Sequence, residues 1–234
     1  LTELGYEVKM QNADAGVVYA GLAKGDINVF MDSWLPDTHE DYMNEYGAKI
    51  DDVAVSYYEG ELGWVVPAYL EDINSIEDLI GNESLFEGRV VGIDEGAGLT
   101  ATSRELIKEY GLDYNYVTSS EAAMMAQATK DIANEKPILF VGWRPHSMFA
   151  MWDLKILDDS KDMFKTQEVH VLASQDLKDR ANSAYQFLSS WNISVAEIEE
   201  MILLLDENTR LKPEDVAAEW IENNRAKVDS MLGK

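Results

Sequence analysis

Hydrophobic positions along the chain alternate between short apolar runs and longer segments with helical periodicity. The apolar runs predict strands at 6–10, 26–31, 88–94, 137–141 and 168–172. The run Gly63–Tyr69 contains Pro67 and therefore suits an edge strand or a crossover better than a central strand. The helical periodicity predicts helices at 15–24, 38–46, 120–133, 177–190, 194–205 and 213–232.

Two Ser/Thr-x-x-acid patterns add helix starts to this picture. Ser75–Asp78 has the spacing of a capping box, and Thr102–Glu105 has it within a helix that stops near Gly111. Strands that alternate with helices predict an α/β protein with mostly parallel sheets. The helical tail and the Pro67 crossover predict two lobes. We expect lobe one to combine residues 1–70 with 170–234, and lobe two to hold 71–169.

The beginning of the chain predicts the last turn of a helix, a stop at Gly5 and then a strand. It has no basic segment, apolar run and cleavage site of the kind that make a signal peptide. A domain rarely begins on the last turn of a helix. We therefore expect an upstream strand and most of a helix to be missing.

Composition and charge exclude several classes of partner. The 234 residues include 19 basic and 44 acidic side chains, which gives a formal net charge of −25. Nucleic acids and anionic lipid surfaces are recognised mainly by Lys and Arg, so neither is an expected partner. No apolar run approaches the ~20 residues of a bilayer span. Cysteine is absent, which excludes disulfides, thiolate zinc sites and cysteine nucleophiles. We interpret the acidity as an aid to solubility or to life in salt.

Candidate chemistry follows three of the predicted strands. The strand at 27–31 leads into the loop 32–39, the strand at 89–93 into 94–100, and the strand at 137–141 into 142–146. Ligands of open α/β sheets bind outside the carboxyl ends of the strands. The three loops are therefore candidates for one ligand site.

These loops suit a small zwitterion. Gly96-Ala97-Gly98 before a helix offers backbone N–H groups and a positive dipole end, and it lacks the lysine of a phosphate loop, so a carboxylate fits better than a nucleotide. Trp34 and Trp143 offer π faces to a cation that cannot donate hydrogen bonds. His39 could donate to the carboxylate. We expect no metal and no cofactor, because no cluster of metal ligands is present.

Each feature also has a simpler interpretation. The Gly-x-Gly fits a tight turn, either tryptophan fits a hydrophobic plug, and His39 fits a capping residue. We interpret His146 as structural. The core is expected to include Trp152, Trp191, Trp220, Met124 and Met125. Trp64 lies at the predicted crossover, and the sequence does not assign it to the core or to the ligand site.

The three loops resemble the glycine betaine-binding proteins of ABC transporters. The resemblance lies in Asp32-Ser33-Trp34-Leu35-Pro36-Asp37-Thr38-His39, Gly92-Ile93-Asp94-Glu95-Gly96-Ala97-Gly98-Leu99 and Gly142-Trp143-Arg144-Pro145-His146-Ser147-Met148-Phe149. Leu4–Val8 and Leu154–Asp159 continue it, so it covers essentially the whole chain. It implies a two-lobed periplasmic-binding-protein fold of type II that closes on its ligand.

The resemblance also implies residue roles. Trp34 and Trp143 match two walls of the cage around the trimethylammonium group. Gly98 and Leu99 match backbone N–H donors to the carboxylate, and His39 matches its side-chain donor. A third cage tryptophan of the family would come from a strand before Leu1. Ser147 stands where relatives often carry another tryptophan, and it is not among the residues to which the resemblance assigns a role.

The expected function is that of a receptor, not an enzyme, that captures glycine betaine, or proline betaine, for osmoprotectant uptake. It would be a monomer that delivers the ligand to a transmembrane permease. It would act outside the cytoplasm, with a lipid anchor or fused to the permease.

Three alternatives remain. A choline or carnitine receptor has the same fold, and the negative charge favours the cation choline. An enzyme acting on a small carboxylic acid would use His39 or His146 as a base beside Asp37. A pure interaction module would not need either tryptophan for binding.

Overall fold

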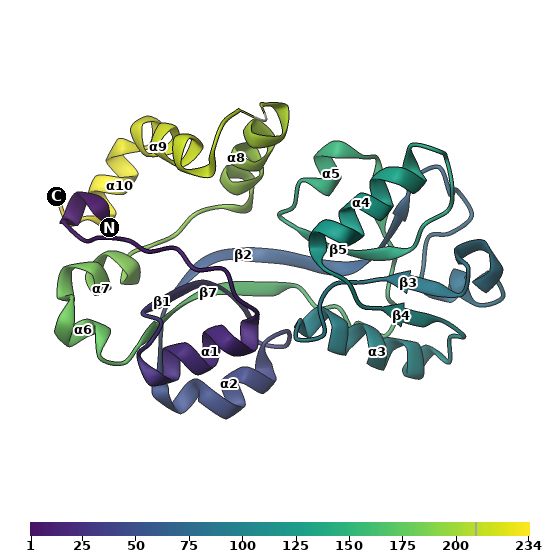
Figure 1. Cartoon of the computed structure of the whole chain (residues 1–234), viewed down its shortest axis with the longest axis horizontal. Coiled ribbons are helices and arrows are strands. Elements are labelled where there is room, and N and C mark those ends of the chain that lie inside the picture. The colour runs from purple at the N-terminus through teal and green to yellow at the C-terminus, as the bar shows by residue number, and fades with distance from the viewer. Residues whose placement is uncertain (209) are drawn as a thin grey trace. The chain divides into compact units, whose positions relative to one another are not determined.

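The computed structural model describes residues 1–208 and 210–234, and they form two compact units. Unit 1 combines Leu1–Gly60 with Gln167–Lys234, and unit 2 is the continuous segment Glu61–Thr166. The chain therefore leaves unit 1 after Gly60 and re-enters it at Gln167. Figure 1 labels the elements of both.

Unit 1 begins with a 3-10 turn at Thr2–Leu4, which Gly5 ends in the left-handed conformation. It then contains α1 (Ala15–Lys24), β1 (Val29–Leu35), α2 (Glu40–Tyr46), a 3-10 turn (Gly47–Lys49) and the first part of β2 (Ile50–Pro67). After the return of the chain come β7 (Gln167–Ser174), α6 (Leu177–Arg180), α7 (Asn182–Ser189), α8 (Val195–Glu207), α9 (Pro213–Asn223) and α10 (Arg225–Met231).

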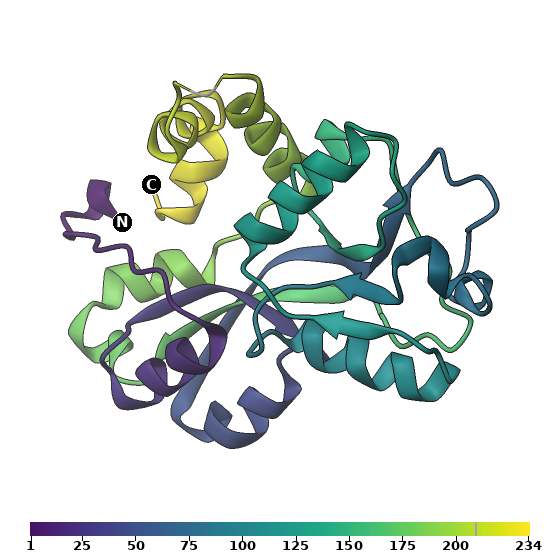
Figure 2. The same cartoon turned by 45° about the vertical axis from the view of Figure 1, so that its right-hand side comes forward.

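The sheet of unit 1 is antiparallel, with β7 between β1 and β2. The expectation of mostly parallel strands is wrong here, because β2 carries the chain out of the unit and β7 brings it back in the opposite direction. Side chains alternate across β7. Leu172 packs with Tyr19 and Leu22 of α1, whereas Val171 and Ala173 pack with α6 and α7. Figures 1 and 2 both show α1 and α2 along one side of these strands.

Unit 2 contains the end of β2, two 3-10 turns (Glu77–Leu79 and Glu83–Phe86), β3 (Arg89–Val91), α3 (Gly98–Tyr110), β4 (Asn115–Val117), α4 (Glu121–Ile132), β5 (Phe140–Arg144), α5 (Met148–Met151) and β6 (Leu154–Ile156). Here β3 is parallel to both β4 and β5, whereas β2 is antiparallel to β5 and β6. Both views show α3 and α4 on opposite sides of these strands (Figure 2).

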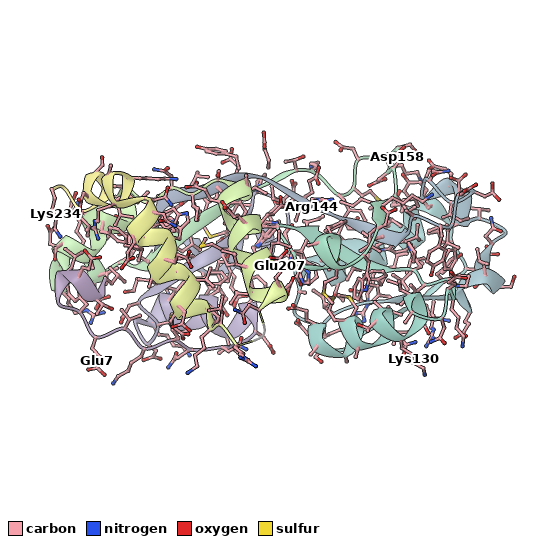
Figure 3. All side chains as sticks on the ribbon, turned by 90° about the horizontal axis from the view of Figure 1, so that it is seen from above. Glu7, Lys130, Arg144, Asp158, Glu207 and Lys234 are labelled. Carbon is pink, nitrogen blue, oxygen red and sulfur yellow. The ribbon has the colours of Figure 1, made fainter. Side chains whose placement is uncertain are left out.

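Surface and core separate in unit 2 as the sequence pattern demands. The core contains Trp64, Phe140 and Met124, none of which is exposed to solvent. Trp64 is therefore a core residue, and its Nε1 donates to Ser103 Oγ at 2.9 Å. Met125 and Trp152 pack partly buried against the same cluster, whereas Lys130 on α4 points outward (Figure 3).

Several predicted boundaries are wrong, for local reasons. Of the two expectations for 63–69, an edge strand or a crossover, the edge strand is wrong. Residues 63–67 belong to β2, and this part of β2 has neighbours on both sides, because Val65 pairs with Phe140 and with Ile156. Pro67 is tolerated because it lies at the last residue of the strand. Thr102 lies inside α3 and caps nothing, since the helix already begins at Gly98.

The predicted strand at 6–10 is also wrong. Residues 6–10 form no strand and pair with no strand among the residues that the structure describes, and Val8 and Met10 are exposed to solvent. A strand exists only where a neighbour satisfies its backbone, so strand-like composition alone was not sufficient.

The helical tail of unit 1 borders an apolar cavity of about 400 Å³, together with the N-terminal turn, β1 and β2. Its walls include Met31 of β1, Trp191 and Trp220. The Trp191 Nε1 donates to Ser56 Oγ at 2.8 Å, whereas the buried Trp220 Nε1 has no partner among the described residues. Both tryptophans thus pack inside unit 1.

Candidate functional site

Trp34 lies near the end of β1, inside the strand and not in the loop after it as predicted. The strand continues to Leu35 because Trp34 and Leu35 pair with Val169 and Glu168 of β7. The indole is 7% exposed, and its Nε1 donates to Asp32 Oδ1 at 2.8 Å. Its ring meets the Tyr57 ring edge-on, with the centroids 6.3 Å apart. The indole is therefore held in one orientation from two sides.

His39 forms a closed pair with the backbone of Trp34. The ring Nδ1 of His39 accepts the backbone N–H of Trp34 at 3.1 Å, and the backbone N–H of His39 donates to the Trp34 carbonyl at 2.9 Å. Because Nδ1 is an acceptor, the proton of the neutral ring must be on Nε2. No hydrogen bond reaches Nε2 from the described part of the chain. His39 therefore has one hydrogen-bond donor to offer.

The surroundings of His39 keep its ring uncharged. Tyr19, Phe30 and Tyr42 surround it, with ring centroids 5.6 to 6.3 Å away. Burial lowers the pKa of His39 to about 4, since the apolar walls disfavour the imidazolium. The side chain is thus a neutral N–H donor at physiological pH.

Trp143 lies inside β5, opposite Leu62 of β2, and it too was predicted to follow its strand. The indole is half-buried, and its ring meets that of His146 edge-on at a centroid distance of 4.6 Å. His146 Nδ1 accepts the Met148 N–H at 3.0 Å, and Nε2 lies 3.2 Å from Glu121 Oε1. Both nitrogens of His146 are therefore occupied, and the ring supports Trp143.

The start of α3 offers two backbone donors. Ala97 is the N-cap residue, and its carbonyl accepts the N–H groups of Thr100 and Ala101. No acceptor among the described residues takes the N–H of Gly98 or of Leu99. The first N–H groups of a helix have no partner within the helix, and they lie at its N-terminal end, where the helix dipole is positive. This end of α3 can therefore hold an anion.

Topology brings the two unit 2 features to one edge of the sheet. β3 leads to the start of α3, β5 ends beyond Trp143, and these strands are parallel neighbours, with Val91 paired to Phe140. Trp143 packs against the apolar cluster that contains Leu99. Unit 1 separately brings Trp34 and His39 together. The structure thus gathers the five predicted residues into two groups, one in each unit.

A model of the family described as the substrate-binding domain of ABC-type glycine betaine transport systems, OpuAC, matches residues 1–223. The chain belongs to this family. A curated relative, the glycine betaine/carnitine transport binding protein GbuC of Listeria monocytogenes, is 38% identical over 143 residues. That match covers 59% of this chain and 47% of the relative, so the chain matches only about half of the length of that protein.

Solved structures extend the likeness to the whole fold. The lactococcal OpuAC, in its closed-liganded conformation with glycine betaine, is 30% identical, with a TM-score of 0.91. The alignment covers 99% of this chain and 90% of that one. A choline-binding protein of an ABC transporter, in complex with choline, is 23% identical and has a TM-score of 0.90 over 100% of this chain and 84% of its own. These likenesses confirm the predicted fold of type II periplasmic binding proteins.

Within residues 1–208 and 210–234, no helix is both long enough and apolar enough to cross a membrane. The same residues contain no group of three or more His, Asp or Glu side chains placed to hold a metal ion.

Sequence reasoning found the residue types of this site but missed their supports. Asp32, which holds the Trp34 indole, lies two residues away and could have been found from the motif itself. Tyr42 lies three residues after His39 and could have been found from the motif as well, whereas Tyr19 is twenty residues away in the sequence and gave no signal.

Proposed function

We propose that this chain captures glycine betaine and delivers it to the permease of an ABC importer. Membership of the family supports the class of ligand. The observation that carries the choice of a betaine is the pair of N–H groups at Gly98 and Leu99, which have no acceptor among the described residues. They provide a place for a carboxylate.

The trimethylammonium end would contact Trp34 and Trp143. Such a cation has no N–H to donate, so it binds best against the π faces of indoles. Each such contact contributes roughly 0.5–2 kcal/mol, which predicts modest affinity from two walls. In support, both indoles are held in place by neighbours, Trp34 by Asp32 and Trp143 by His146.

The carboxylate end would accept hydrogen bonds from Gly98, Leu99 and His39. The neutral His39 suits this role because Nδ1 is engaged with the backbone and Nε2–H is available. Hydrogen bonds to a charged group contribute about 1.5–3 kcal/mol each, more than neutral ones.

Choline and carnitine are the competing ligands. The name of the Listeria relative includes carnitine, and one structural relative was solved with choline. Carnitine also has a quaternary ammonium and a carboxylate, separated by a longer chain, so only the space between the two groups discriminates against it. Choline has no carboxylate and would leave the donors of α3 without a partner, although the net charge of −25 attracts a cation.

Titrations followed by tryptophan fluorescence and by calorimetry test this proposal. We expect saturation with glycine betaine, weaker binding of proline betaine and carnitine, and the weakest binding of choline. Recovery of unchanged ligand, checked by NMR, is expected of a receptor that performs no chemistry. Saturation by choline without any response to glycine betaine would overturn the choice of ligand.

We further propose that the protein works as a monomer outside the cytoplasm, attached to the membrane by a lipid anchor or by fusion to its permease. Membership of a family of ABC-type transport systems supports this location. Cell fractionation of the producing organism, with an antibody against the chain, tests it.

A further inference from the structure

Gln167 is a buried amide at the point where the chain re-enters unit 1. It is 1% exposed and is the first residue of β7. Its Oε1 accepts the N–H groups of Asp37 and Thr38 at 3.1 and 3.2 Å, and its Nε2 donates to Asp37 Oδ2 at 3.3 Å. Both N–H groups lie in the segment that joins Trp34 to His39, so one side chain fixes the backbone between two proposed ligand residues.

Gly60 lies opposite Gln167, at the point where the chain leaves unit 1. The two residues are partners in the ladder between β2 and β7. A Cβ atom on Gly60 would lie 2.6 Å from Cζ3 of Trp34 and 3.3 Å from the Gln167 carbonyl oxygen. The indole ring therefore lies directly against the Gly60 backbone, and only glycine allows that approach.

Both strands that connect the units thus touch the same ligand segment. The division of the chain falls at Gly60/Glu61 and at Thr166/Gln167. A backbone rotation at Gly60 would move the surface that supports the Trp34 ring. A rotation at Gln167 would move the amide that holds Asp37 and Thr38.

We propose that Gly60 and Gln167 are positioning residues that couple the ligand segment Trp34–His39 to the backbone of the two connecting strands. The inference rests on the proposed function, because it takes Trp34 and His39 as ligand contacts. Neither positioning residue is itself a proposed ligand contact. Coupling of this kind is reciprocal: a ligand that fixes the segment restricts the connecting strands by the same free energy.

The substitution Gln167→Leu tests the coupling. It leaves the N–H groups of Asp37 and Thr38 without the Gln167 acceptor, and we expect the Kd for glycine betaine to rise on the order of tenfold. Amide hydrogen exchange supplies a readout that lost stability alone would not move. In the unsubstituted protein, we expect saturating glycine betaine to slow exchange both at 37–38 and in β2 and β7 around residues 60 and 167. In the variant at saturation, we expect protection at 37–38 without protection at the connecting strands.

Gln175→Leu is the matched control. Gln175 is exposed in the same unit, and its Nε2 donates to the Ala48 carbonyl, remote from the ligand segment in sequence. Its replacement should leave the Kd and the exchange pattern unchanged.

An exchange of donor and acceptor provides rescue. In Gln167→Glu the new carboxylate still accepts both N–H groups but faces the carboxylate of Asp37, so binding should weaken. Adding Asp37→Asn restores a donor opposite Glu and keeps the net charge of the pair. We expect the double variant to recover most of the affinity that Gln167→Glu loses.

Gly60→Ala tests the other strand, with Gly63→Ala as its control on the same strand. A Cβ on Gly63 would lie 2.5 Å from Ile156 Cγ2, a comparable clash within unit 2. Both substitutions should lower the urea midpoint, but only Gly60→Ala should shift the tryptophan emission and raise the Kd.

The outcomes separate the two proposals. If the unsubstituted protein does not bind glycine betaine, the proposed function fails and the coupling fails with it. If it binds, but Gln167→Leu shows the same Kd and the same protection of both strands, the coupling is wrong and the proposed function stands. Should Gln167→Leu fail to fold, the double variant and the glycine pair decide: no rescue, together with an unchanged Kd in Gly60→Ala, overturns the coupling.

Discussion

The segments around Trp34 and Trp143 contain the same kinds of residue, but the histidines of the two segments have different surroundings. Each has a tryptophan near the end of a strand, a proline two residues later, and a histidine whose Nδ1 accepts a backbone N–H. In unit 2 the second nitrogen of His146 lies against Glu121. In unit 1 no described residue takes the second nitrogen of His39, and aromatic rings surround it.

The difference shows that the role of a histidine in such a motif depends on which groups face its second ring nitrogen. A carboxylate at Nε2 makes His146 a support for the neighbouring indole, and the hydrogen bond to His146 lowers the pKa of Glu121. Apolar rings make His39 a neutral donor that a ligand can use. The following experiments separate these roles.

Replacement of the tryptophans should give the largest effects. Trp34→Ala and Trp143→Ala should each weaken glycine betaine binding by about tenfold or more, since each removes one of the two proposed cation–π contacts. Of these two tryptophans only Trp34 is nearly fully buried, so Trp34→Ala should also lower the free energy of unfolding by about 3–5 kcal/mol. Calorimetry and urea denaturation measure the two quantities.

Trp191→Ala is the control for these two variants. Trp191 packs inside unit 1 and donates to Ser56, away from the proposed ligand contacts. It should lower stability without changing affinity, and a change in its Kd would contradict the assignment.

The second expected effect is a dependence of stability on pH that originates in His39. Its pKa is about 4 in the folded state and about 6.5 in the unfolded chain. Between these values the unfolded chain binds a proton that the folded state does not. The contribution is therefore fully present above pH 6.5 and is lost as the pH falls through 4, about 3 kcal/mol in total.

Urea denaturation at pH 7 and pH 4.5 measures it, with His39→Gln as the comparison. The difference between the two proteins isolates His39 from the many carboxylates that titrate in the same range. Equal losses in both proteins would show that His39 is not held neutral by burial.

The third expected effect is a loss of affinity in His39→Ala. Loss of one hydrogen bond to a carboxylate should weaken glycine betaine binding by about 10- to 100-fold, which corresponds to about 1.5–3 kcal/mol. His170→Ala is the control, because His170 is paired with Asp52 at 2.9 Å and is no proposed ligand contact. Unchanged affinity in His39→Ala would make the carboxylate assignment wrong.

The smallest effect should come from Glu121→Gln. Its carboxylate is more than half exposed, so solvent screens the pair with His146 and the expected loss of stability is about 0.5 kcal/mol. An amide can still accept from Nε2 and keep the His146 ring against Trp143. Binding measured by fluorescence should not change, whereas a tenfold loss would show that Glu121 acts on the ligand.

Helices were predicted best, because their signals are local. Residues 15–24 form α1 as expected, with Gly25 in the left-handed conformation at its end, and Ser120 caps α4 with its side chain. Ser75 and Asp78 form the expected reciprocal hydrogen bonds, although the helix that follows is a single 3-10 turn.

Strands were predicted less well, because their limits depend on distant partners. β1 and β5 lie about three residues later than expected, since β7 and β2 supply pairing that the apolar runs do not show. The first half of β2 was missed because Asp51, Asp52 and Glu59 break the apolar pattern.

At the candidate site, too, residues within local motifs could be predicted, whereas residues that act through distant partners could not. The motifs named Trp34, His39, Gly98, Leu99 and Trp143, whose roles remain predictions. They could not name Gly60 or Gln167, because Gln167 meets Asp37 across 130 positions of sequence.

The interrupted path of the chain has a consequence for synthesis on the ribosome. Unit 2 is complete once Thr166 has emerged, whereas unit 1 still lacks β7 and the helices α6 to α10. At roughly 5–20 residues per second, the segment Gln167–Lys234 needs several seconds. Unit 2 can therefore fold first. During that time the unpaired edge of β2 and the apolar face of α1 are accessible to chaperones or to neighbouring chains.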